Sequence, residues 1–76
     1  MPVTIKCFAS LREELGVSQK EVEFRPGLLV SDCWKAVTEK EKPENLLCAR
    51  NLEYVGLEEP LADGDEVAFF PPVTGG

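Results

Sequence analysis

The reactive groups of this sequence are few, and the terminal carboxylate is the one in an unusual setting. The chain ends in Phe-Phe-Pro-Pro-Val-Thr-Gly-Gly over residues 69–76. Gly75 and Gly76 lack a Cβ, so the end could pass through a narrow channel into another protein's active site. A free carboxylate, with a reference pKa of about 3.5, is ionised and inert as an acyl donor at neutral pH. It must first be activated, for example as an adenylate made by a partner that binds ATP, and a sulfur nucleophile would then convert it to a thiocarboxylate.

The other reactive side chains form no recognisable catalytic or metal-binding set. The chain has no histidine, which excludes a Ser–His or Cys–His nucleophile pair. Its glycines form no phosphate-binding motif. Cys7, Cys33 and Cys48 are 26 and 15 positions apart and lack the close pairs that zinc or iron–sulfur ligation needs. We therefore expect reduced cysteines in the core, no bound metal and no catalysis by this chain alone.

The charge is distributed unevenly along this chain of 76 residues, whose length suits a single domain. Residues 1–50 hold eight basic and eight acidic residues, whereas residues 51–76 hold six acidic and no basic ones, which gives the net charge of −6. An acidic chain without a basic patch repels phosphates, so no nucleic-acid partner is expected. The acidic half is either a solvated surface or a means of steering toward a basic partner protein.

Hydropathy argues against a membrane protein. The longest apolar run, residues 67–73, contains two prolines and is too short to span a bilayer. The N-terminal segment has a strand pattern rather than that of a signal peptide. We expect a cytoplasmic protein with no membrane partner.

Hydrophobic spacing predicts a small α+β domain. Apolar residues alternate near both ends of the chain and recur at helical spacing from Val30 to Val37. Ser10 and Ser31 are expected to cap two helices, and Gly16 to end the first. The expected elements are a strand from residue 3, a short helix to residue 15, a strand over 21–24, a main helix between Ser31 and Pro43, and strands over 46–50, 52–55 and 66–70.

One sheet folded over one helix is the economical packing for this order of elements. In the first strand, the residues that alternate toward the helix leave Phe8 on the opposite side. In the last strand Phe69 faces the core, which turns Phe70 outward. Exposed aromatic side chains at two strand ends are uncommon unless a loop or a partner covers them.

Two prolines separate this domain from the end of the chain. Pro71 and Pro72 fix φ near about −65° and donate no backbone hydrogen bond, so they stop the last strand and begin a stiff, extended segment. Residues 71–76 can reach roughly 20 Å at about 3.3 Å per residue. We therefore divide the chain into a domain over residues 1–70 and an extended C-terminal tail over residues 71–76.

The sequence resembles the MoaD family, the small subunits of molybdopterin synthase, among the ubiquitin-like β-grasp sulfur carriers. The segments responsible are residues 7–13 (CFASLRE), 51–55 (NLEYV) and 63–76 (DGDEVAFFPPVTGG). The resemblance implies a β-grasp fold, with a mixed sheet of four to five strands on one main helix and a flexible Gly-Gly tail. Family members usually carry an apolar residue where this chain has Arg50.

The resemblance also implies a reaction sequence. A MoeB-type enzyme uses ATP to adenylate Gly76, and a sulfur-donating protein supplies the sulfur of the thiocarboxylate. The tail then enters the large, MoaE-type synthase subunit, where sulfur passes to cyclic pyranopterin monophosphate and forms the dithiolene that later holds molybdenum. In the family, two carriers join two large subunits. The carrier itself binds no cofactor, Gly75 gives slender access, and the implied partner contacts are Phe8, Arg12, Tyr54, Phe70, Pro71, Pro72, Val73 and Thr74.

Three alternatives remain open from the sequence. The chain could carry sulfur for the thiazole of thiamin or for tRNA thiolation, although thiamin carriers usually lack the two prolines. It could be a protein modifier that forms isopeptide bonds with lysines. It could also be a binding module that uses the face around Phe8 and Phe70 and has no need of its terminal glycines.

Overall fold

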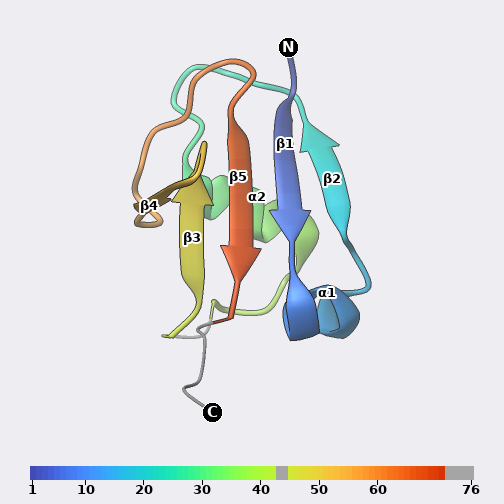
Figure 1. Ribbon diagram of the computed structural model, residues 1–76. Coiled ribbons are helices and arrows are strands. Elements are labelled where there is room, and N and C mark those ends of the chain that lie inside the picture. Colours follow the sequence, from blue (N-terminus) through green and yellow to red (C-terminus); the bar gives the residue numbers. More distant parts are fainter. Residues whose placement is uncertain (43–44, 72–76) are drawn as a thin grey trace.

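The computed structural model describes residues 1–42 and 45–71, in which one sheet packs against one helix (Figure 1). The elements are β1 (Val3–Cys7), α1 (Ala9–Leu15), β2 (Gln19–Val22), α2 (Val30–Val37), β3 (Leu47–Arg50), β4 (Glu53–Val55) and β5 (Glu66–Phe70). The predicted order of strands and helices is confirmed, and β5 has the predicted bounds. Of the predicted tail, residues 72–76 lie outside the described residues.

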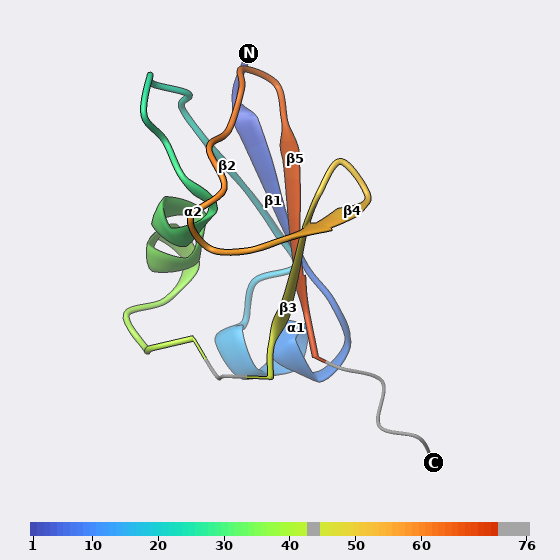
Figure 2. The ribbon, with the colours of Figure 1, turned by 90° about the vertical axis from the view of Figure 1, so that its left-hand side faces the viewer.

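The sheet is mixed and has five strands in the order β2-β1-β5-β3-β4. The central strands β1 and β5 are parallel, whereas the other neighbours are antiparallel. Helix α2 covers one face of the sheet, and we call the other face the open face (Figure 2). Because β1 and β5 run in the same direction, their C-terminal ends lie at the same end of the sheet, where α1 also lies (Figure 1).

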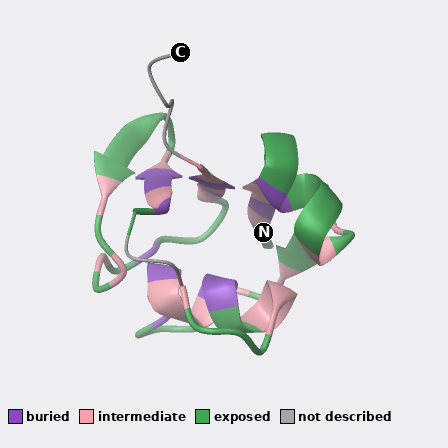
Figure 3. Cartoon of the chain, turned by 90° about the horizontal axis from the view of Figure 1, so that it is seen from below, coloured by how far each residue is buried: buried purple, intermediate pink, exposed green. Residues whose placement is uncertain are grey.

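The core lies between the sheet and α2 (Figure 3). Val30, Cys33 and Trp34 of α2 are buried there, as the predicted apolar stripe requires. Phe69 of β5 is fully buried and meets the Trp34 ring edge to face, with centroids 5.2 Å apart and planes at 71°. The Trp34 indole N–H donates to the carbonyl oxygen of Lys40 at 2.8 Å, so this polar atom is paired inside the domain.

The expectation that Ser31 caps the main helix is wrong. Helix α2 begins at Val30, so Ser31 lies inside its first turn. The free N–H groups of this turn are satisfied from a distant loop: Val30 donates to the carbonyl of Glu59 at 3.1 Å and Ser31 to that of Leu57 at 2.9 Å. The carboxylate of Asp32 accepts the Leu29 N–H at 2.9 Å. Main-chain carbonyls therefore replace the expected hydroxyl cap.

The expected Ser10 cap of the first helix is also wrong. Helix α1 begins at Ala9, and its N-cap residue, Phe8, makes no side-chain capping bond. Ala9 has a φ of 55°, a left-handed value that turns the chain sharply out of β1. At the other end Gly16 has a φ of 71° and donates to the carbonyl of Arg12 at 2.9 Å, which confirms the predicted glycine stop.

Candidate functional site

The candidate site begins where β5 ends, and we call the segment Phe70–Pro71 the tail exit. The two parallel central strands are held together up to this point, since the Phe8 N–H donates to the carbonyl of Phe69 at 3.2 Å. Phe8 also lies at the turn into α1, so the ends of β1 and β5 and the start of α1 lie at the same end of the sheet (Figure 1). The residues that precede the tail are therefore fixed by the ladder of the sheet.

Two aromatic residues lie together on the open face beside the tail exit. Tyr54 of β4 and Phe70 of β5 have ring centroids 5.9 Å apart, at an interplanar angle of 45°. The registers explain this proximity: Ala49 of β3 pairs with Tyr54 of β4, and Leu47, two residues earlier on the same face of β3, pairs with Phe70 of β5. Tyr54 is 75% exposed, and Phe70 is half-buried.

Phe8 and Arg12 lie at the same end of the sheet, Phe8 at the start of α1 and Arg12 within it. Phe8 is 46% exposed, which confirms that its side chain is not part of the core. Arg12 is exposed on α1, and its N–H donates to the carbonyl of Phe8 at 3.4 Å. The structure thus brings Tyr54 and Phe70 into contact and places Phe8 and Arg12 near the end of β1. Of the predicted tail contacts Pro71 is half-buried, while Pro72, Val73, Thr74, Gly75 and Gly76 lie outside the described residues.

The three cysteines are buried and free, as predicted. Burial raises the pKa of each thiol, and that of Cys33 reaches about 11 because the Asp32 carboxylate adds to the effect of burial. A thiol of this kind is a poor nucleophile near neutral pH. Within the described part of the chain, no group of three or more His, Cys, Asp or Glu side chains is placed to hold a metal ion. We therefore assign the cysteines to packing.

Most carboxylates in the acidic second half of the chain have a polar or charged partner within the domain. The paired carboxylates are Glu59 with Arg50 (3.0 Å), Glu66 with Lys6 (2.8 Å), Asp63 with the N-terminal amine (2.7 Å) and Asp65 with the Asn51 amide (2.9 Å). Among residues 51–71, Glu53 and Glu58 are left without a described partner. Several carboxylates of this half thus hold the fold together, while the net charge of −6 remains available for attraction to a basic partner.

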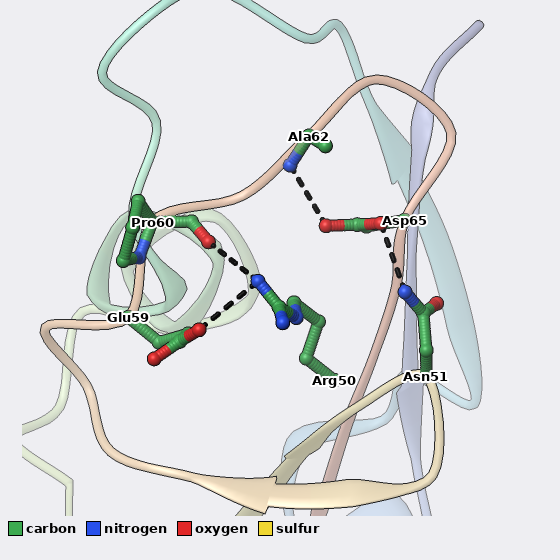
Figure 4. A network of polar contacts seen from close by, with 6 residues as sticks. All are labelled: Arg50, Asn51, Glu59, Pro60, Ala62 and Asp65. Atoms are coloured by element: carbon green, nitrogen blue, oxygen red, sulfur yellow. Dashed lines mark hydrogen bonds and ion pairs between the residues drawn. The ribbon is translucent and has the colours of Figure 1, made fainter.

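Arg50 and Asn51 form a polar network that sequence reasoning did not find (Figure 4). Arg50 pairs in register with Val67, so its stem follows the core side of β3, where an apolar residue would fit. Its Nη1 donates to the carbonyl of Pro60 at 3.1 Å and contacts Glu59, which ties the loop after β4 to the sheet. Asn51 ties the β3–β4 turn to the start of β5, accepting the Glu66 N–H at 3.0 Å. The Asp63-Gly64-Asp65 segment is typical of a turn, but the local sequence does not reveal that Asp65 bonds to Asn51, which lies far from it along the chain.

None of the described helices is both long and apolar enough to cross a membrane.

Comparison with known proteins agrees with this architecture. Residues 5–76 match the ThiS family. The chain is 41% identical to the molybdopterin synthase sulfur carrier subunit of Escherichia coli, over 97% of this chain and 99% of that protein. It is 42% identical to the same subunit of Haemophilus influenzae, over 91% and 93%. The crystal structure of SAMP1 from Haloferax volcanii superposes with a TM-score of 0.81 at 30% identity, over the whole of both chains.

Proposed function

This chain belongs to the ThiS family, and from that membership we propose that it is the sulfur carrier subunit of a molybdopterin synthase. The main support for this proposal is the 41–42% identity to two proteins of that name over nearly the full chain. The geometry supports the proposal, because β5 ends at the end of the sheet where exposed aromatic side chains lie. The fold is thus suited to dock on a partner while the residues that follow Pro71 enter it.

The proposed chemistry takes place on the terminal carboxylate. An adenylating enzyme of the MoeB type joins Gly76 to AMP and releases pyrophosphate. Hydrosulfide released by a sulfur-donating protein then attacks the acyl carbon, the bond to AMP breaks, a proton is lost, and Gly76 carries a thiocarboxylate. Phe8, Arg12, Tyr54 and Phe70 would contact the large, MoaE-type subunit, in which the thiocarboxylate gives its sulfur to cyclic pyranopterin monophosphate. Pro71 to Thr74 would line the route, and Gly75 would leave room for the end.

The carrier would leave activation to its partners. The sequence contains no histidine, and its three thiols are buried with raised pKa values. A covalent step on the tail therefore has neither a histidine base nor an ionised thiol to draw on within this chain. The carrier would hold no cofactor of its own, and ATP would be consumed on the activating enzyme.

Intact mass spectrometry of the protein isolated from its native cells tests the proposal. A carrier is expected to show a second species, heavier by the difference between sulfur and oxygen, with the change mapped to Gly76. The matched control is a variant that ends at Thr74, which should show one mass. A wild-type protein that never acquires the heavier mass in cells making molybdenum cofactor would contradict the proposal.

A second function is favoured by the structural similarity to SAMP1, whose name in a second structure is small archaeal modifier protein 1. In a modifier, a lysine ε-amine would attack the activated Gly76 and form an isopeptide bond. An immunoblot of the native cells separates the two functions. Conjugates of higher mass that vanish in the variant ending at Thr74 would indicate a modifier, whereas free protein alone agrees with a carrier.

A further inference from the structure

Leu52, at the tip of the β3–β4 hairpin, combines two unfavourable features. It is 90% exposed, the highest value among the exposed large hydrophobic residues of the described chain. Its φ is +71°, in the left-handed region that side chains branched beyond Cβ seldom occupy. An asparagine or glycine would suit this backbone better and would expose no large apolar side chain to water. A residue that is unfavourable for both the backbone and solvation suggests a role outside the folded monomer.

The neighbouring structure prevents the turn from relaxing. Arg50 pairs with Glu53 across the hairpin, so Asn51 and Leu52 form a two-residue loop. Asn51 has a φ of 50°, and positive values at both positions are the pattern of a type I′ turn. Asn51 is held in place by its bond to Asp65 (Figure 4) and by a second bond to the Glu66 N–H. Leu52 is consequently fixed in its strained conformation by interactions that it does not make itself.

The turn lies on the same side of the sheet as the aromatic pair. In Figure 2 the connection between β3 and β4 projects away from α2, toward the side of the open face, and Figure 3 agrees. Tyr54, two residues beyond Leu52, is 75% exposed, and its ring centroid lies 5.9 Å from that of Phe70. The backbone of the turn that carries Leu52 and the Tyr54–Phe70 pair therefore lie on the same side of the sheet, between the hairpin tip and the tail exit.

We propose that Leu52 is an anchor for the same large synthase subunit that receives the tail. The inference rests on the proposed function and extends its docking surface by one residue. A partner that grips the tail must lie over Phe70, and a standard interface of about 800 Å² per side is roughly 30 Å across. The strand from Leu47, opposite Phe70, to Arg50 covers only about 10 Å of that width. The partner can thus reach the tip without a second interface.

The charges around the tip indicate what the receiving surface contains. Glu53 follows Leu52, is exposed and has no described partner, and the chain carries a net charge of −6. A complementary partner would present an apolar pocket for Leu52 with a lysine or arginine at its rim. Anchoring Leu52 would remove it from water, which recovers part of the unfavourable exposure of the free carrier.

The substitution Leu52→Asn separates docking from folding. Asparagine suits a left-handed φ, so the urea midpoint of the free domain should stay the same or rise. The dissociation constant for the purified large synthase subunit of the same organism, measured by calorimetry, should increase about tenfold. Leu52→Met should keep most of the affinity. Lys35→Ala, an exposed change on α2 at the far face, is the matched control and should change neither value.

The outcomes distinguish this inference from the proposed function. If wild-type carrier binds the large subunit and Leu52→Asn binds equally well, the anchor is wrong while the proposed function stands. If Leu52→Asn lowers the urea midpoint, Leu52 has a structural role and the inference also fails. If the wild-type carrier does not bind the large subunit at all, the proposed function fails and takes the anchor with it.

Discussion

Phe69 and Phe70 are neighbours in the chain, yet their side chains lie on opposite faces of β5. Phe69 is fully buried against Trp34, whereas Phe70 lies on the open face in contact with Tyr54. The alternation of a strand produces this division, since successive side chains point to opposite faces. One residue therefore holds the domain together, and the next belongs to the proposed docking surface.

This pair gives a sharp test at the scale of single residues. Phe69→Ala should lower the free energy of unfolding by about 3–5 kcal/mol, because it leaves a cavity in the core. Phe70→Ala should cost far less stability but weaken binding to the large synthase subunit at least tenfold. Urea denaturation of the free domain and calorimetry of the complex measure the two effects. Equal losses of stability in both variants would show that Phe70 serves the fold rather than a partner.

The outward positions of Phe8 and Phe70 could be predicted because each follows from alternation along an extended segment, β5 for Phe70 and β1 with the residue after it for Phe8. Their relation to other residues could not. The contact between Tyr54 and Phe70 depends on two strand registers, that of β3 with β4 and that of β3 with β5. The strain at Leu52 depends on a turn whose partner bonds come from residues 65 and 66. Local patterns carry no information about such distant pairings.

The elements themselves followed from the sequence better than their ends did. Strand β5 and the apolar stripe of α2 were predicted because burial sets their periodicity. The starts of α1 and α2 were missed because a serine was expected to cap each helix. Helix α2 instead receives carbonyl groups from Leu57 and Glu59, some 27 residues further along the chain. Helix α1 starts from a left-handed Ala9, which single-residue propensity would assign to glycine or asparagine.

The network at the β3–β4 turn connects elements through Asp65, and its stability should depend on pH. Burial, the largest single effect, raises the pKa of Asp65, but bonds from the Ala62 N–H and the Asn51 amide, with the charge of Arg50, outweigh it and lower the pKa below 3.8. A carboxylate with a lowered folded pKa stabilises the domain above its unfolded pKa, and that contribution is lost as pH falls through the folded value. The stabilisation is therefore complete at neutral pH and fades below about pH 4.

The substitution Asp65→Asn tests this linkage. At pH 7 it should lower the free energy of unfolding by about 1 kcal/mol, and the difference from wild type should shrink in urea titrations near pH 3. Glu53→Gln, at an exposed carboxylate without a described partner, should show no such convergence. A difference that stays constant between the two pH values would rule out ionised Asp65 as the source.

At the scale of the whole molecule, the buried core of the described residues runs from Val3 to Phe69. The residues that pack the domain and those proposed to react therefore occupy separate parts of the chain. The domain boundary predicted at residue 70 coincides with the last residue of β5. The extended tail beyond it stays a prediction, as do the roles of its residues.

This separation predicts that shortening the chain will leave the fold unaffected. A variant that ends at Pro71 should unfold within about 0.5 kcal/mol of the wild type in urea, because it retains all the residues that are buried in the described part of the chain. The same variant should no longer be adenylated, as measured by pyrophosphate release with the activating enzyme. A loss of several kcal/mol would indicate that the removed residues pack on the domain.

The edge-to-face contact between the sole tryptophan and Phe69 has a practical consequence for anyone who handles this protein. The indole emission should report whether the centre of the domain is intact, since Trp34 is only 5% exposed. It lies behind the sheet from the surface that we expect partners to touch. Fluorescence should therefore follow unfolding yet remain silent during association, which gives an intrinsic optical probe that separates a misfolded mutant from one that has merely lost its partner.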